Sequence, residues 1–289
     1  MRGWLWLALV LSLAASCAGP QAPPSGKIRV AVSIPPLADF VSQVGGDRVE
    51  TVTLVPPGAS VHTYEPTPSQ IEFVAKADML VLNGLGLEFW ADKVVKGSGN
   101  ARLLMVDTSV GVETISGDEG GGANPHIWLD PLRAMVQVAN IRDGLTKIDP
   151  ANSDLYRTNA SRYIQGLSAL NSEIAARVQT WQYKQFISFH SAWVYFAQRY
   201  GLKQVAVIEE FPGKEPSPAY IAQVVALAKG LPVRAIFAEP QLSPKVAETV
   251  AKESGKTVLL LDPLGGVEGR YSYTELMRYN VGEMEKALK

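Results

Sequence analysis

Cysteine and histidine are both scarce in this chain of 289 residues, which contains one cysteine and three histidines. A single cysteine excludes a framework of internal disulfides. No two histidines have the i, i+4 spacing that places two metal ligands on one helix face, so any site built from them must be assembled by the fold. Lysine and arginine number 27 against 28 acidic residues, without a basic run, which argues against nucleic acid as a partner.

The first 17 residues have the pattern of an export signal. Arg2 supplies a positive start, and the apolar run at 4–15 is shorter than the roughly 20 residues that span a bilayer. The run ends in Ala14-Ala15-Ser16-Cys17, which resembles the lipobox of bacterial lipoproteins, where the cysteine carries the lipid. An ordinary secretory signal that happens to contain a cysteine is the alternative. Lipidation of Cys17 would account for the lone thiol and anchor the exported protein to the outer face of the cell membrane, or keep it in the periplasm.

Residues 18–26 are rich in proline, glycine and alanine and are typical of a flexible tether. Beyond them, short β-branched runs alternate with amphipathic helical stretches, which predicts an α/β fold with two lobes, each a mainly parallel sheet flanked by helices. Strands are predicted at 27–34, 48–55, 77–83, 102–106, 185–189, 204–208, 233–238 and 257–261.

A stretch at 151–180 separates the two halves and contains no proline and one glycine. This composition predicts one long helix of about 45 Å, and its length suggests a spine that connects the lobes. A long surface helix is the alternative. The predicted organisation is an N-terminal lobe at 27–147, a linking helix at 148–181 and a C-terminal lobe at 182–289.

Each histidine falls where a predicted strand or loop is followed by a helix. His62 lies in the loop at 56–68, His190 ends the strand at 185–189, and His126 precedes Asp130-Pro131, which predicts the N-cap and first residue of a helix. Taken singly, each histidine could be structural, and His190 beside Phe189 could belong to the core.

Together the histidines suggest a different role. Asp262 directly follows the last predicted strand, and ligands bind outside the carboxyl ends of strands in parallel sheets. Three imidazoles and one carboxylate, two from each half, are the donors that a borderline cation such as zinc prefers.

Several motifs occur in order along the chain: Pro-Gly-x-x-x-His-x-Tyr-Glu-Pro-Thr-Pro at 57–68, Asn-Pro-His-Ile-Trp-Leu-Asp-Pro at 124–131, Phe189-His190, Glu215-Pro216-Ser217-Pro218, Glu239-Pro240-Gln241 and Asp262-Pro263-Leu264. This set resembles the metal-binding, zinc or manganese type of substrate-binding lipoprotein of bacterial ABC transporters. The resemblance implies that the metal ligands are His62, His126, His190 and Asp262. It also implies a monomer that is not an enzyme, captures one divalent cation between its lobes and delivers it to an ABC permease with its ATPase subunit.

The implied donors favour zinc over manganese. Manganese members of the family more often replace the third histidine with glutamate and so gather two carboxylates, which suits a harder ion. Two departures from the family pattern are present: the loop at 118–122 lacks the histidine-rich sequence of many zinc members, and Ser191 stands where aspartate is common. Three nitrogens and one oxygen still predict Zn²⁺, with Mn²⁺ as the alternative.

Two other functions fit the same chain. A secreted zinc-dependent hydrolase would need an open coordination position and a general base, and no motif supplies that base. The sequence is also compatible with a surface adhesin.

Other carboxylates have competing interpretations. Glu65 either orients an imidazole or caps the following helix, and Glu239 either supports the site or holds the region between the lobes. Glu209-Glu210 and Asp118-Glu119 are interpreted as solvated charges.

Overall fold

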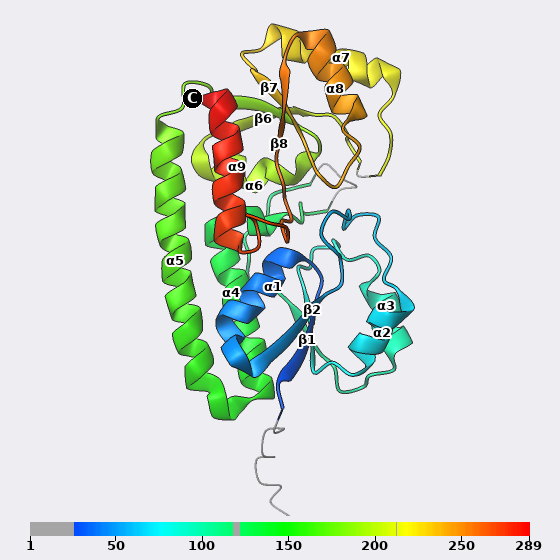
Figure 1. Ribbon diagram of the computed structural model, residues 1–289, viewed down its shortest axis with the longest axis vertical. Helices are drawn as coiled ribbons and strands as arrows, with labels where there is room; N and C mark the ends of the chain where they lie inside the picture. Colours follow the sequence, from blue (N-terminus) through cyan, green and yellow to red (C-terminus); the bar gives the residue numbers. More distant parts are fainter. Residues whose placement is uncertain (1–25, 118–121, 212) are drawn as a thin grey trace, which may run out of the picture.

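The protein is described by a computed structural model that covers residues 26–117, 122–211 and 213–289. Figure 1 shows two lobes stacked along the long axis of the molecule. Each lobe has one sheet of four parallel strands, in the order β2-β1-β3-β4 in the first and β6-β5-β7-β8 in the second. The strands are β1 (Ile28–Val32), β2 (Val49–Thr53), β3 (Met79–Leu82), β4 (Leu104–Asp107), β5 (Gln185–Ser188), β6 (Lys203–Val207), β7 (Ala235–Ala238) and β8 (Thr257–Leu260).

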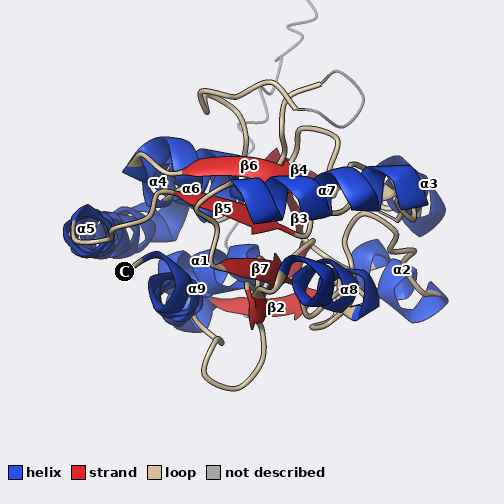
Figure 2. Cartoon of the chain, turned by 90° about the horizontal axis from the view of Figure 1, so that it is seen from above, coloured by secondary structure: helices blue, strands red, loops and turns tan. Residues whose placement is uncertain are grey.

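Helices cover both faces of the strands. Seen from above, α4, α5, α6 and α9 lie on one side and α2, α3, α7 and α8 on the other (Figure 2). Their bounds are α1 (Pro35–Gly45), α2 (Pro68–Ala75), α3 (Ala91–Ser98), α4 (Pro131–Ile148), α5 (Ser153–Gln179), α6 (Val194–Tyr200), α7 (Pro218–Gly230), α8 (Lys245–Ser254) and α9 (Tyr273–Leu288). The predicted fold class, two α/β lobes with parallel sheets, is confirmed.

The long helix α5 runs beside both lobes (Figure 1). Its 27 residues correspond to about 40 Å. A buried stripe recurs every three to four residues or at twice that interval, as expected for a helix with one face against a core. The stripe consists of Tyr156, Ala160, Leu167, Leu170, Ile174 and Val178. This confirms the prediction of one long helix that links the lobes.

One apolar cluster extends through both lobes, and a second cluster lies within the second lobe. Leu80 in β3 belongs to the same buried cluster as Phe186 in β5 and Phe237 in β7. Hydrogen bonds also cross the junction: Trp128 Nε1 donates to the carbonyl of Pro263 at 2.7 Å. Because packed cores resist small displacements, the shared core fixes one lobe against the other.

Asp130 forms the polar centre of this junction. Its Oδ1 accepts from the backbone N–H of Leu132 at 3.0 Å, so it caps α4 as predicted. Its carboxylate, 0% exposed, also pairs with Arg133 from the same helix and with Arg199 from α6 in the other lobe. One buried acid therefore starts a helix and joins two lobes.

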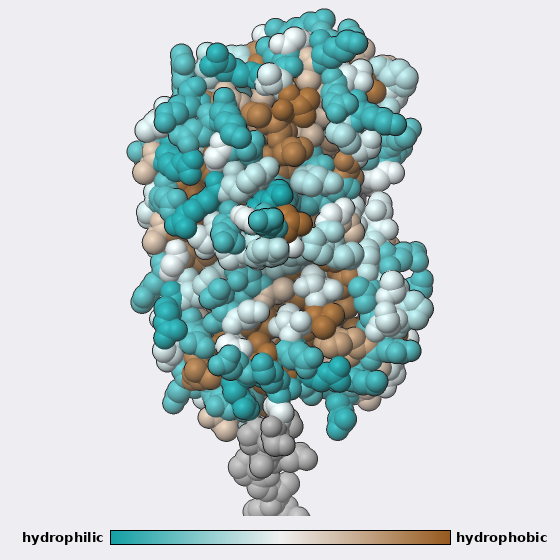
Figure 3. All heavy atoms as spheres, in the orientation of Figure 1, coloured by the Kyte–Doolittle hydropathy of each residue, from teal (hydrophilic) through white to brown (hydrophobic). Residues whose placement is uncertain are grey.

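Hydrophobic side chains are unevenly distributed over the surface of the protein (Figure 3). In the orientation of Figure 1, hydrophobic side chains gather over β8, one of the two edge strands of the second sheet (Figure 3). Leu260 in this strand is 40% exposed. Among the described helices, none is both long and apolar enough to cross a membrane. The predicted export signal, Cys17 and most of the predicted tether lie outside the described residues, as do Asp118-Glu119.

Candidate metal centre

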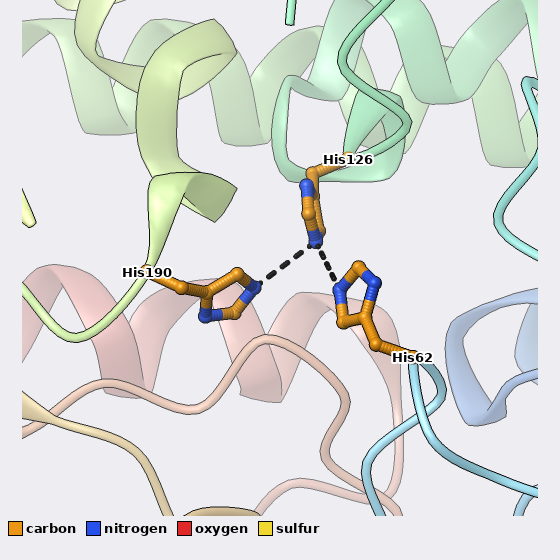
Figure 4. A group of neighbouring side chains, drawn as sticks. All are labelled: His62, His126 and His190. Carbon is orange, nitrogen blue, oxygen red and sulfur yellow. Dashed lines mark hydrogen bonds between the residues drawn. The ribbon is translucent and has the colours of Figure 1, made fainter. Parts of the chain in front are cut away.

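Three imidazoles from distant parts of the chain meet at the junction of the lobes. His126 Nε2 lies 3.1 Å from His62 Nε2 and 3.1 Å from His190 Nε2. Figure 4 shows the three rings converging from separate segments, with these nitrogens toward one point. Among the described residues, these histidines form a group whose ligand atoms all lie within 4.8 Å of one another. The structure thus brings together three of the four predicted ligands.

The spacing of the nitrogens suits a shared cation. A tetrahedral zinc ion with Zn–N bonds of about 2.0–2.1 Å separates its nitrogen ligands by about 3.3 Å. The two separations of 3.1 Å from His126 are close to that value. The nitrogens of His62 and His190 also lie within 4.8 Å of each other, so one ion could contact all three rings.

His126 is oriented by the residue two positions before it. Asn124 Oδ1 accepts from the backbone N–H of His126 at 3.0 Å and faces the ring Nδ1 at 3.0 Å. The amide of Asn124 donates to the carbonyl of Ser191 in the other lobe at 2.8 Å, which fixes the direction of the oxygen. Since an amide oxygen can only accept, Nδ1 carries the proton and Nε2 keeps its lone pair for an ion.

His190 has a carboxylate in the equivalent position. Its Nδ1 lies 2.7 Å from Glu239 Oε1, and both residues are buried, with 3% and 2% exposure. Glu239 comes directly after β7, next to the strand that delivers His190, so adjacent strands of one sheet place the pair. The carboxylate holds the proton on Nδ1 and makes Nε2 a stronger donor to a metal.

His62 comes from the loop between β2 and α2, and Gln70 secures that loop. The Gln70 side chain accepts from the hydroxyl of Tyr64 at 2.6 Å and donates to the carbonyl of Leu54 at 2.6 Å. It also completes the capping box of α2 with Thr67. The start of one helix thereby fixes both ends of the segment that carries His62.

His62 and His126 are neutral in this arrangement. Burial, and then the nearby His190, lower the pKa of His62 to about 3. Burial, and then His190 and His62, lower the pKa of His126 well below its usual value. A metal ligand must be the unprotonated imidazole, so the fold keeps both rings in the binding form at neutral pH.

Apolar side chains enclose the site. Val61, Leu242 and Leu264 line the cavity together with the three histidines and Trp128. The Trp128 ring lies against His126, with 5.2 Å between ring centroids. An ion held here would exchange its water shell for imidazole nitrogens in an apolar enclosure.

Asp262, the fourth predicted ligand, is placed differently. Its carboxylate does not belong to the group of converging ligand atoms found among the described residues. Oδ2 pairs with Arg270 at 3.0 Å, and Oδ1 accepts from Gln241 at 2.7 Å. Its neighbours Pro263 and Leu264 line the cavity, so the residue lies just behind the wall of the site.

Two interpretations of other carboxylates are wrong. Glu65 neither orients an imidazole nor caps α2: its side chain is 73% exposed and pairs with Lys93, because Thr67 is the N-cap. Glu209 is not a solvated charge. It is 6% exposed, and burial raises its pKa, whereas Glu210 is exposed as predicted.

The sequence interpretation did not assign Asn124 a role and left the role of Glu239 open. Asn124 could have been recognised from its position two residues before a histidine, since asparagine side chains bond to the backbone two residues ahead. Nothing in the sequence pairs Glu239 with His190, because β7 and β5 become neighbours only in the folded sheet.

Comparisons with known proteins agree with this geometry. The family described as ZnuA, zinc-uptake complex component A, periplasmic, matches residues 30–287. The high-affinity zinc uptake system protein ZnuA of Bacillus subtilis (strain 168) is 30% identical over 280 residues, covering 91% of this chain and 88% of the relative. The manganese-binding lipoprotein MntA of Halalkalibacterium halodurans is 31% identical over 260 residues, covering 88% and 86%. A crystal structure of ZnuA has a TM-score of 0.84 and 34% identity, covering 90% of this chain and 99% of that one.

Proposed function

This chain belongs to the family of periplasmic zinc-uptake complex component A proteins, and on that premise we propose that it captures zinc in preference to manganese and delivers it to a permease. Without regard to which metal is preferred, the chain is a zinc or manganese substrate-binding protein of an ABC importer. Members of the family are transport components and not enzymes, so the alternative of a secreted zinc hydrolase is not supported.

The convergence of three Nε2 atoms is the observation that carries this proposal. His62, His126 and His190 are the proposed ligands, and Asp262 is the proposed fourth donor from behind the cavity wall. Three neutral nitrogens satisfy a borderline cation such as Zn²⁺ better than Mn²⁺, which prefers oxygen. The zinc preference rests on this donor chemistry.

A protein that captures metal ions for import must be located outside the cytoplasm. We propose that residues 1–17 direct export, that Cys17 carries a lipid, and that 18–26 tether the body to the membrane. The lobes at 27–147 and 182–289, joined by the helix at 148–181, then act as one monomeric receptor for the permease and its ATPase subunit. Mass spectrometry of the mature protein tests the lipid directly: an unmodified Cys17 in membrane-derived protein would refute the anchor.

Equilibrium dialysis with metal analysis tests the function. Purified protein is expected to bind one Zn²⁺ and, more weakly, one Mn²⁺ per chain. His126→Ala removes the ring that contacts both others and is expected to abolish binding. Glu65→Gln is the matched control, since Glu65 lies in the His62 loop but is exposed and paired with Lys93. Absence of bound metal in the unaltered protein, or full binding by His126→Ala, would overturn the proposal.

A further inference from the structure

The Asp262 carboxylate has its hydrogen-bonding capacity largely committed. Oδ1 accepts from Gln241 Nε2 at 2.7 Å and from the backbone N–H groups of Leu264 and Gly265, each at 3.0 Å. Oδ2 faces Arg270 Nη1 at 3.0 Å. The residue is 2% exposed, so Arg270, and not water, balances its charge.

Arg270 is held in place by its own loop. Its backbone N–H donates to the carbonyl of Val267 at 2.9 Å, and its carbonyl accepts from Gly266 at 2.9 Å. The guanidinium also lies over the ring of Tyr279, 4.4 Å from its centroid. Gly265 has a φ of +67°, and a Cβ there would lie 2.7 Å from the Arg270 carbonyl oxygen. The loop therefore presents the guanidinium to Asp262 in a fixed position.

The same carboxylate is next to the metal centre. Gln241, which donates to Asp262, lines the cavity of the three histidines, and so do the two residues that follow Asp262. A cation in the cavity and the guanidinium would thus compete for Oδ2, since both are positive and Oδ1 is committed to three donors. Arg270 restrains the one oxygen that could join the nitrogens.

We propose that Arg270 is a positioning residue that sets the metal specificity of the site. This inference rests on the proposed function and adds to it how zinc is favoured. By holding Asp262 Oδ2, Arg270 weakens the proposed fourth donor and leaves the three imidazole nitrogens to dominate metal binding. Zinc is well bound by such a set, whereas manganese gains most from a carboxylate oxygen. The guanidinium therefore discriminates against the harder ion.

Chelator-competition titrations with Zn²⁺ and with Mn²⁺ test this. Arg270→Gln is expected to raise Mn²⁺ affinity about tenfold or more, since a freed carboxylate adds an anionic ligand, and to raise Zn²⁺ affinity by less than about threefold. Arg270→Lys keeps the positive charge and is expected to retain most of the original selectivity. Arg278→Gln, which breaks an exposed ion pair with Glu173 on the neighbouring helix, is the matched control.

The double variant Arg270→Gln with Asp262→Asn shows whether Arg270 acts through Asp262. It removes both charges together, and the gain in Mn²⁺ affinity is expected to disappear. Equal changes for both metals, no change in Arg270→Gln, or a gain that persists in the double variant would overturn the inference. Failure of the unaltered protein to bind either metal would instead refute the proposed function, so the two failures are distinguishable.

Discussion

Replacing Glu239 separates its effect on metal affinity from its effect on stability. Glu239→Gln keeps an amide oxygen that can accept from His190 Nδ1, as Asn124 does for His126, but removes the charge. Charge-assisted hydrogen bonds are about twice as strong as neutral ones, a difference of about 1–1.5 kcal/mol. Metal affinity is therefore expected to fall about tenfold. Glu239→Ala, which removes the acceptor altogether, is expected to cost about a hundredfold.

The stability of the metal-free protein is expected to respond differently. Glu239 is 2% exposed, so its replacement by glutamine removes a buried charge and is expected to change the free energy of unfolding by less than about 1 kcal/mol. Glu239→Ala removes a buried acceptor of the His190 Nδ1 proton and is expected to cost about 1–3 kcal/mol. Metal competition and urea unfolding on the same samples measure both quantities. Unchanged affinity in Glu239→Gln would refute the role assigned to this carboxylate.

Three further predictions concern the metal-free fold. His62, with a pKa of about 3, and His126 stay neutral when folded but take up protons below about pH 6.5 when unfolded. The unfolded state then binds more protons, so stability is expected to fall by about 1.4 kcal/mol per pH unit for His62 as pH drops from about 6.5 toward 3, and His126 adds a loss in the same direction. Urea unfolding between about pH 7 and pH 5 checks this, and a flat profile would contradict it. Asp130→Ala removes a helix cap worth about 1 kcal/mol and the carboxylate partner of a buried arginine, which is worth about 3–5 kcal/mol. Urea unfolding is therefore expected to show a loss of at least about 3 kcal/mol in the free energy of unfolding. A loss below about 1 kcal/mol would exclude a structural role for Asp130 at the junction. Gly144→Ala is expected to lower the free energy of unfolding by about 1–3 kcal/mol, because the added Cβ would meet Val106 at 2.6 Å. Gly166→Ala on α5, where nothing lies within 4 Å of an added Cβ, is expected to raise it by about 0.5–1 kcal/mol. Equal thermal shifts for the two glycine variants would disprove the packing argument.

Local sequence patterns predicted much of this fold because they act over a few residues. The Asp130-Pro131 pair caps α4 through a bond to a backbone N–H two positions away. The run at 151–180 became α5 with ends within two residues of the prediction. The positions of the histidines before helices followed from the alternation of strands and helices, and His190 lies just after the carboxyl end of β5, where ligands of parallel sheets bind.

Contacts between distant residues could not be predicted in the same way. Glu209 and Glu210 are adjacent and chemically alike, yet Glu209 is buried and Glu210 exposed. The backbone N–H of Glu209 donates to the carbonyl of Phe189, a residue distant in sequence. Glu65 occupies a conspicuous position near His62, but Thr67 takes the cap and leaves the carboxylate in solvent. The ion-pair partner of Asp262 is Arg270, eight positions later. Sequence spacing alone does not show which nearby arginine or lysine pairs with a given carboxylate.

The order of the histidines along the chain matters for biosynthesis. His62 and His126 precede α5, whereas His190 follows it, so a growing chain holds two of the three imidazoles until the long helix has been made. The third ring takes its place when β5 joins the core that both lobes share. The three histidines can therefore meet only after α5 and β5 have been made, and a bound ion would report that segments from both lobes have come together.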